Sequence, residues 1–202
     1  MPYLFHDRDM VRLCGQEGAL HDYSAKELGE FRATDKERFG YKFVDNPLTT
    51  LIGLVGLMQR HPGVSVFVEL KRSSLEKFGQ ELMVKKVLSV LEPVKSQCVI
   101  ISYNIAALAH VNTKYNWPVG AVTDDWKDRN VKEIVDLNPQ YLFCDYETLP
   151  KKGQLQFYGS RLAVYECTDP IIAMALHGRG IEFVETFAIG EMLEKFHTMD
   201  GK

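Results

Sequence analysis

The most constraining feature of this sequence is the alternation, from residue 64 onward, of short apolar runs with longer stretches of helical periodicity. The apolar runs, such as CVIIS at 98–102 and YLFCD at 141–145, are contiguous rather than alternately apolar and polar. Contiguous apolar strands are typical of parallel sheets, whose strands are buried on both faces. The chain order therefore predicts an α/β fold in which each strand is followed by a helix.

We expect six strand–helix units. The strands are expected at residues 64–69, 98–102, 119–122, 141–145, 161–166 and 182–186. The helices are expected at residues 51–60, 75–91, 104–115, 128–137, 168–177 and 189–196. Nearer the N-terminus, Ser24 and Glu27 have the spacing of a capping box for a short helix, and we expect no strand of the sheet within residues 8–45.

The helix expected at 168–177 carries signals at both ends. Thr168 or Asp169 is the expected N-cap, and Pro170 suits the first helical turn. Gly178 and Gly180 follow the helix. They predict a left-handed helix stop rather than a phosphate-binding loop, because such a loop precedes its helix.

Six consecutive units fit a (β/α)8 barrel better than an open doubly wound sheet, and no GxGxxG sequence supports a dinucleotide site. A barrel of this class has eight strands and about 250 residues. The 202 residues therefore predict a TIM-type barrel that lacks its first two strands, folded as a single domain over residues 1–202. Because an unclosed barrel leaves two open sheet edges, we also expect self-association through those edges.

Charge and composition exclude several classes of function. The net charge is −3 with no basic block, so a nucleic-acid surface has no support. No apolar run reaches the roughly 20 residues of a membrane span, and no secretory leader is evident. The four cysteines are far apart without a CxxC pair, which argues against zinc and favours buried thiols in a reducing compartment. We therefore expect a cytoplasmic protein.

In a barrel of this class, the chemistry lies at the carboxyl ends of the strands. Glu69 and Lys71 are two residues apart at such an end, so their side chains share a face. They are either a metal ligand beside an anion-binding ammonium or an internal ion pair that fills the barrel. Asp124 and Asp125 are better explained as N-caps of the next helix. The other polar residues at strand ends are Ser102, Tyr103, Asn104, Asp145, Glu166 and Thr186.

The N-terminal segment MPYLF looks like the end of a buried strand, and it continues directly into His6 and Asp7. A lone histidine would carry little information, and the other histidines have no partner at metal-ligand spacing. His6-Asp7 at one strand end, with Glu69 and Lys71 at another, instead indicates an active-site constellation.

These residues resemble the glycerophosphodiester phosphodiesterase family. LFHDRDM at 4–10 is similar to the family's V-x-x-H-D-x-x-L segment, and VFVELK at 66–71 to l-n-i-E-i-K. ISYN at 101–104 resembles S-S-F-x, VYECTDP at 164–170 resembles v-W-T-v-N-D-P, and GIEFVETF at 180–187 resembles G-V-D-g-I-i-T-D. The resemblance covers essentially the whole chain.

The resemblance implies a barrel whose open end binds a divalent cation, commonly calcium or magnesium. It implies a hydrolase of lipid and glycerol metabolism that converts a glycerophosphodiester to glycerol 3-phosphate and an alcohol. His6 corresponds to one of two catalytic histidines, Glu69 to one of three metal carboxylates, and Lys71 to a residue near the phosphate. Tyr165 takes an aromatic position of the substrate cleft, and Tyr103 is expected beside it in substrate binding.

The sequence departs from the family at its start. The family begins with His-Arg-Gly and Glu-x-Asp segments, which supply a second histidine, an arginine and two metal carboxylates, and this sequence begins after them. We therefore expect weak metal binding and little activity from the chain as given. The alternatives are a non-catalytic barrel relative that serves as a binding or interaction module, and an unrelated α/β enzyme using Asp124, Asp125 or Asp145.

Overall fold

The structure is a computed structural model that describes the backbone of residues 1–200 and the side chains of residues 1–198. The chain forms two compact units. The first unit consists of Met1–Val66 and Lys71–Cys98, and the second of Phe67–Leu70 and the chain from Val99 onward. The expectation of a single domain over residues 1–202 stays a prediction.

The first unit is helical. Its elements are α1 (Val11–Cys14), η1 (Leu20–Asp22), α2 (Ala25–Glu30), α3 (Lys36–Phe39), α4 (Leu51–Arg60), α5 (Arg72–Phe78), α6 (Gln80–Leu91) and η2 (Glu92–Gln97). Met10, Leu28 and Leu48 form a buried cluster within it. The capping box of α2 is confirmed, because the Ser24 hydroxyl accepts from the Glu27 amide and the Glu27 carboxylate accepts from the Ser24 amide.

The N-terminal segment is not the end of a buried strand. Tyr3 makes an isolated antiparallel bridge to Thr50, and the Leu4 amide donates to the Thr49 carbonyl at 2.8 Å. Leu4 itself is exposed, and no regular strand forms before His6. The segment therefore reaches His6 as an irregular chain attached to the start of α4.

The helix expected at 75–91 divides at Gly79. This residue has φ of +77°, a left-handed conformation that ends α5 before α6 begins at Gln80. Phe78 and Leu82 on either side of the break are about half exposed. The apolar spacing that suggested one helix therefore includes two side chains outside the core.

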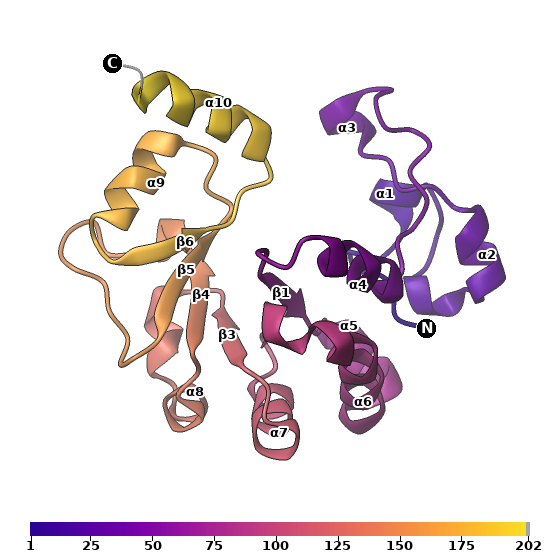
Figure 1. The fold of residues 1–202 in the computed structure, drawn as a ribbon, viewed down its shortest axis with the longest axis horizontal. Coiled ribbons are helices and arrows are strands. Elements are labelled where there is room, and N and C mark those ends of the chain that lie inside the picture. Colours follow the sequence, from indigo (N-terminus) through magenta and orange to yellow (C-terminus); the bar gives the residue numbers. More distant parts are fainter. Residues whose placement is uncertain (201–202) are drawn as a thin grey trace. The chain divides into compact units, whose positions relative to one another are not determined.

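The second unit is built on a six-stranded sheet in the order β1-β2-β3-β4-β5-β6 (Figure 1). The strands are β1 (Val66–Glu69), β2 (Cys98–Ser102), β3 (Val119–Thr123), β4 (Tyr141–Asp145), β5 (Arg161–Tyr165) and β6 (Ile181–Val184). The pairs from β2 to β6 are parallel. Its helices are α7 (Ile105–Tyr115), η3 (Trp126–Asn130), α8 (Lys132–Leu137), η4 (Tyr146–Thr148), α9 (Pro170–His177) and α10 (Ile189–Asp200).

Side-chain contacts across the sheet show that it is strongly curled. The Phe67 ring on β1 lies 5.0 Å from the Phe143 ring on β4 and 5.7 Å from the Phe183 ring on β6, measured between centroids. Since β1 and β6 are the two ends of the strand order, their side chains meet only if the sheet closes around its interior. The structure thus confirms the α/β class and a partial barrel, whereas the loss of the first two strands stays a prediction.

Two further local expectations are corrected. The helix expected at 128–137 is interrupted at Val131, whose ψ of 143° separates η3 from α8. Gly178 is right-handed, with φ of −61°, so it is not the left-handed stop of α9. Gly180 carries the positive φ, +109°, and a Cβ there would lie 2.5 Å from the Leu155 carbonyl oxygen. Asp169 is the N-cap of α9, as one of the two expected residues.

Candidate functional site

Two tyrosines expected in the site meet at the carboxyl ends of their strands. Tyr103 directly follows β2 and Tyr165 ends β5, and their hydroxyl oxygens lie 3.3 Å apart. The Tyr165 hydroxyl also donates to the Thr123 carbonyl at the end of β3, at 2.7 Å. Both rings pack against the interior cluster that includes Ile101 and Val122. These contacts bring two hydroxyl groups and one main-chain carbonyl together at the mouth of the curled sheet.

The phenol of Tyr165 is held in its neutral form. Burial is the main cause that raises the pKa of Tyr165, and the hydrogen bond with Tyr103 raises it further. The hydroxyl donates its proton to a main-chain carbonyl, which a phenolate cannot do. Tyr165 therefore acts in this arrangement as a hydrogen-bonding and packing group rather than as a base.

Glu69 and Ser102 lie at the same ends of their strands in different surroundings. Glu69 is half-buried and follows Phe67 by two residues, so alternation along β1 places it on the interior face. Ser102 is fully buried, and its hydroxyl donates to the Leu70 carbonyl at 2.7 Å and accepts from the Asn104 amide. Ser102 therefore joins the chain after β1 to the chain after β2 at this end of the sheet.

Among the acidic residues at the other strand ends, Asp125 and Asp145 cap short helices, whereas Asp124 and Glu166 are exposed. The Asp125 carboxylate caps η3 by accepting from the Lys127 amide, which confirms one of the two expected caps. Asp124 is exposed and caps no helix among residues 1–200. The Asp145 carboxylate accepts from the Glu147 amide at 2.9 Å, and Glu166 is exposed with φ of +52°.

His6 in the first unit lies at one end of a hydrogen-bond network of polar side chains. Its Nδ1 lies 2.8 Å from Oδ1 of Asp7, and its side chain is 73% exposed. Arg12 donates to both oxygens of Asp7, from Nε at 2.7 Å and from Nη2 at 2.8 Å, and its Nη1 donates to Asp35. The hydrogen bond from Arg12 is the main cause that lowers the pKa of Asp7. Asp7 is therefore an ionised acceptor that orients the imidazole of His6.

The remaining expected residue, Lys71, occupies the N-cap position of α5 and is half-buried. Lys71 and His6 belong to the first unit, and Glu69, Tyr103 and Tyr165 belong to the second. Within the second unit, the structure places Tyr103 and Tyr165 in contact.

A metal ion requires several oxygen or nitrogen ligands that converge. Among the residues whose side chains are described, no group of three or more His, Cys, Asp and Glu is arranged to hold a metal ion. Calcium takes six to eight oxygen ligands and magnesium six, so a single carboxylate such as Glu69 is far from sufficient. The described residues therefore do not by themselves fit a tight site for either cation.

Three contributors to these arrangements could not be recognised in the sequence. The Thr123 carbonyl has no side-chain signal, because every residue carries a carbonyl. Arg12 and Asp35 are ordinary charged residues in the sequence, and only the fold brings both to Asp7. The five-residue spacing of Asp7 and Arg12 is too common a pattern to have indicated the pair.

The curled sheet, with polar groups at the carboxyl ends of its strands, defines the class as a partial α/β barrel of the TIM type. No protein-family model matches the sequence, and no curated protein matches it. Within residues 1–200, none of the helices combines the length and apolar character needed to cross a membrane.

Comparison of structures shows a more particular fold, that of the glycerophosphodiester phosphodiesterases. An Oleispira antarctica phosphodiesterase, solved in complex with the product sn-glycerol-3-phosphate, matches with a TM-score of 0.76 and 16% identity over 96% of this chain and 79% of that one. A glycerophosphodiester phosphodiesterase from Parabacteroides distasonis matches at 0.69 and 16%, covering 98% of this chain and 79% of that one. An Agrobacterium tumefaciens enzyme of the same name matches at 0.67 and 11%, covering 91% and 77%.

Proposed function

We propose that this chain belongs to the glycerophosphodiester phosphodiesterase family and binds glycerophosphodiesters at the carboxyl end of its sheet. The observation that carries the proposal is the likeness of fold over 96% of the chain to a phosphodiesterase whose structure holds sn-glycerol-3-phosphate. The motifs around His6 and Glu69 support the same conclusion from the sequence. Four free cysteines are consistent with the proposed cytoplasmic location.

His6 is the proposed general acid and base of the hydrolysis. Because ionised Asp7 accepts a hydrogen bond from Nδ1 of His6, Nε2 of His6 is left to take or give a proton. The side chain of His6 is exposed, so Nε2 faces solvent. Asp7 acts through His6 as a positioning residue, and Arg12 holds Asp7 in place with two hydrogen bonds.

Lys71 is the proposed partner of the phosphate, since an ammonium stabilises the anionic phosphodiester. Tyr103 and Tyr165 are the proposed walls of the substrate cleft, and their half-buried rings offer apolar area with a hydroxyl at the edge.

A divalent cation, calcium or magnesium, is proposed as the cofactor, with Glu69 as a ligand. The described residues do not complete such a site. We therefore expect weak cation binding and slow turnover for the chain as given. Calorimetric titration should show no tight stoichiometric binding of either ion. A tight site would point to carboxylates not assigned here, with Asp124, Asp125 and Asp145 as the first to replace.

The incomplete metal site among the described residues favours a second candidate function. A barrel relative without a complete metal site can bind a glycerophosphodiester or glycerol 3-phosphate without cleaving it, as a binding or interaction module. The two functions share the phosphate-binding role of Lys71 and the walls formed by Tyr103 and Tyr165, but only the hydrolase needs proton transfer by His6.

Two measurements on the full chain separate these functions. The first follows release of glycerol 3-phosphate from glycerophosphocholine in a coupled assay, with and without a chelator. The second measures binding of glycerol 3-phosphate by calorimetry. Turnover that falls about 10²–10⁴-fold in His6→Ala supports hydrolysis with His6 as the acid or base. The matched control is His61→Ala, another exposed histidine of the first unit.

Binding without turnover, weakened by Lys71→Ala and unaffected by His6→Ala, supports the binding module. If the chain neither binds glycerol 3-phosphate nor releases it, the proposed family function is wrong. If His6→Ala turns over as fast as the unaltered chain, the proposed substrate stands, but His6 is not the acid or base of the reaction.

A further inference from the structure

The segment from residue 36 to residue 44, here called the 36–44 loop, exposes an unusual set of side chains. It begins with α3 and has the sequence KERFGYKFV. Tyr41 is 87% exposed, Phe43 59%, Val44 41% and Phe39 38%. Four large apolar or aromatic side chains within six consecutive positions are thus open to solvent. Such clustering marks interaction surfaces, whereas single exposed apolar residues do not.

Two aromatic side chains of the loop, those of Phe39 and Phe43, pack against each other and not into the core. The rings of Phe39 and Phe43 meet edge to face, with centroids 5.5 Å apart. The guanidinium of Arg38 lies over the Phe39 ring at 4.7 Å. None of these residues contributes to the buried cluster of the first unit around Met10 and Leu28. The loop therefore presents a preformed aromatic surface with a cation attached to it.

Two residues of the loop have a positive φ. Gly40 has φ of +58° and Phe43 has φ of +60°. For a bulky residue such as Phe43, the left-handed region is strained. Strained residues cluster at functional sites, so this conformation supports a function for the loop.

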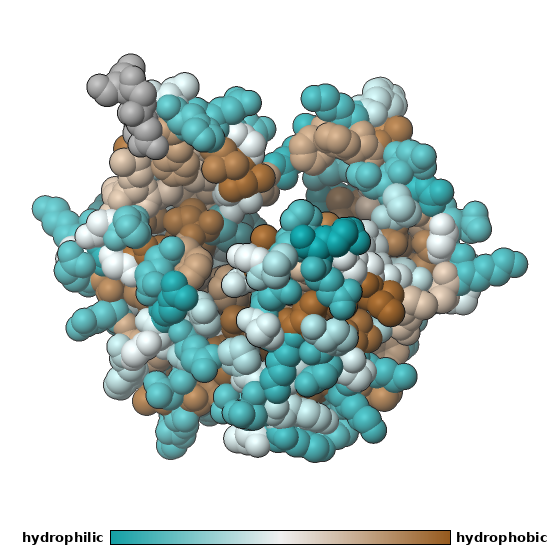
Figure 2. Space-filling view, viewed as in Figure 1, coloured by the Kyte–Doolittle hydropathy of each residue, from teal (hydrophilic) through white to brown (hydrophobic). Residues whose placement is uncertain are grey.

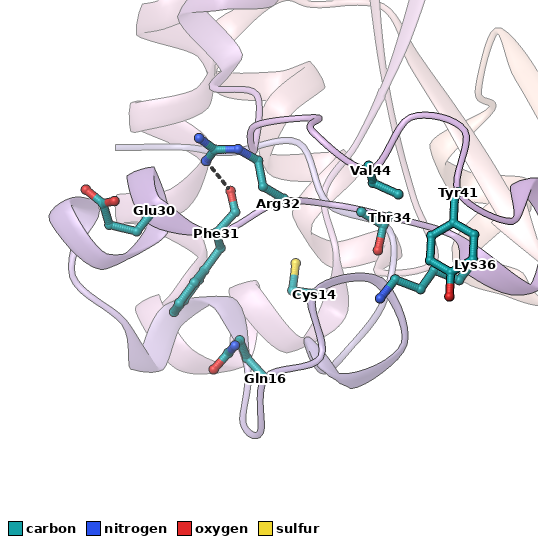
Figure 3. A pocket seen from close by; sticks show the side chains of 9 residues that line it. All are labelled: Cys14, Gln16, Glu30, Phe31, Arg32, Thr34, Lys36, Tyr41 and Val44. Atoms are coloured by element: carbon teal, nitrogen blue, oxygen red, sulfur yellow. Dashed lines mark hydrogen bonds between the residues drawn. The ribbon is translucent and has the colours of Figure 1, made fainter.

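A pocket of about 370 Å³ separates the loop from α1 and the chain after α2 (Figure 3). Lys36, Tyr41 and Val44 line it from the loop, facing Cys14 and Phe31. In Figure 3, the Lys36 and Tyr41 side chains are on one side of the pocket and Phe31 is on the other, with the Cys14 thiol between them in this view. The loop therefore stands away from the body of the first unit along this side.

The net charge of the loop is opposite in sign to the net charge of the whole chain. Residues 36–44 carry Lys36, Arg38 and Lys42 against Glu37 alone, a net charge of +2, whereas the whole chain carries −3. The two aspartates that flank the loop are each held by an arginine from outside it. Asp35 accepts from Arg12 at 2.9 Å and Asp45 from Arg32 at 2.8 Å.

In Figure 2, tan surface lies next to teal and pale surface on the part of the molecule that carries α3 in Figure 1. Adjacent apolar and cationic side chains at one exposed loop are the chemistry that suits the surface of an anionic membrane. Aromatic and apolar side chains enter the interfacial layer, and basic side chains pair with acidic headgroups.

We propose that the 36–44 loop docks the protein peripherally onto anionic phospholipid membranes, with the side chains of Phe39, Tyr41, Phe43 and Val44 in the interfacial layer and Lys36, Arg38 and Lys42 on the headgroups. The surface belongs to the first unit and requires no catalytic activity. The proposal thus stands or falls independently of the proposed hydrolase or binding function.

The test is sedimentation of the full chain with vesicles of two parts phosphatidylcholine to one part phosphatidylglycerol, compared with vesicles of phosphatidylcholine alone. We expect binding to the anionic vesicles and little to the neutral ones, with release as the salt concentration rises to molar. A chain that does not bind the anionic vesicles at low salt refutes the proposal, and the exposed surface is then left to a protein partner.

Variants with matched controls locate the contact. The pair Lys36→Ser and Lys42→Ser should lower partitioning by about fivefold for each lysine. Lys151→Ser with Lys152→Ser, in an exposed loop of the second unit, removes the same charge and should change partitioning much less. Equal losses in the two pairs would show that only net charge matters and would overturn the assignment to this loop.

The aromatic contribution is tested in the same way. Tyr41→Ser with Phe43→Asn should lower partitioning by about tenfold or more, because the membrane-inserted apolar area is lost. Asn suits the left-handed backbone at position 43, so the substitution keeps the loop conformation. The control is Tyr158→Ser, which removes a tyrosine that is 72% exposed in the second unit. Unchanged melting temperatures establish that the variants are folded, and unchanged binding of the loop variant would overturn the proposal.

Discussion

Replacement of Tyr165 by Phe removes one hydroxyl from the mouth of the curled sheet and keeps the ring. The hydroxyl donates to the Thr123 carbonyl at 2.7 Å and lies 3.3 Å from the Tyr103 hydroxyl. A neutral hydrogen bond contributes about 0.5–1.5 kcal/mol net, and a buried acceptor left without its donor costs about 1–3 kcal/mol. Thr123 is buried, so water has little access to its carbonyl as a substitute donor. We expect Tyr165→Phe to lower the free energy of unfolding by about 1–2 kcal/mol.

The pH dependence of this loss has a definite sign. Burial raises the pKa of Tyr165 above its ordinary value near 10. A raised folded-state pKa stabilises the protein fully below the unfolded-state pKa, and the contribution is lost as the pH rises above it. The difference in stability between the unaltered protein and Tyr165→Phe should therefore be constant up to about pH 9 and shrink above pH 10.

The measurement is urea unfolding, followed by fluorescence, at several pH values. Tyr158→Phe serves as the control, since this tyrosine is exposed and its hydroxyl is not at the mouth of the sheet. It should leave stability unchanged at every pH. If Tyr165→Phe is as stable as the unaltered protein at neutral pH, the hydrogen bond to Thr123 does not contribute as argued. A difference that grows above pH 10 would contradict the direction of the pKa shift.

Three further predictions follow from the structure. Gly180→Ala should lower the free energy of unfolding by at least about 2 kcal/mol, because the residue has a positive φ and the new Cβ would lie 2.5 Å from a carbonyl oxygen. The control is Gly153→Ala, where φ is +95° and no atom lies near the new Cβ, and it should cost only about 1 kcal/mol. Equal losses in urea unfolding would show that the carbonyl contact is relieved. Arg12 lowers the pKa of Asp7, so the ion pair stabilises the folded protein fully above pH 3.8, the ordinary pKa of aspartate, and this stabilisation is lost as the pH falls below that value. Arg12→Gln should therefore reduce the loss of unfolding free energy at acid pH. An unchanged dependence of stability on acid pH would contradict the role given to Arg12. The end strands β1 and β6 should promote self-association, which a concentration-independent monomer in sedimentation equilibrium would exclude.

The strands could be predicted closely because their signal is local. The runs 98–102 and 141–145 are contiguous, apolar and bounded by polar residues, and they form β2 and β4 with the same limits. The helices were predicted less well because apolar spacing does not reveal a backbone break. At Gly79 the periodicity continues across the residue while the chain adopts a left-handed conformation. The same limitation applies at Val131, where no glycine or proline marks the interruption.

The candidate site could be predicted only in part because its contacts join distant positions. Tyr103 and Tyr165 are 62 residues apart, and β3 and β4 lie between their strands in the sheet order. Their placement at strand ends follows from the sequence, but their contact depends on the curvature of the sheet. Ser102 shows the reverse case. Its place at a strand end was expected, but the side chain points away from the interior cluster and bonds to Leu70.

The rings inside the curled sheet have a consequence for how its two ends are held. Neighbouring strands are aligned by a ladder of main-chain hydrogen bonds, and a slip of one residue would reverse every side chain. Phe67 and Phe183, on the end strands, meet instead through ring edges and faces. Such contacts define no hydrogen-bond register between these two strands. Ring size rather than hydrogen-bond geometry then determines how far apart they lie, and a smaller side chain at position 67 would narrow or loosen the interior without altering any strand pairing.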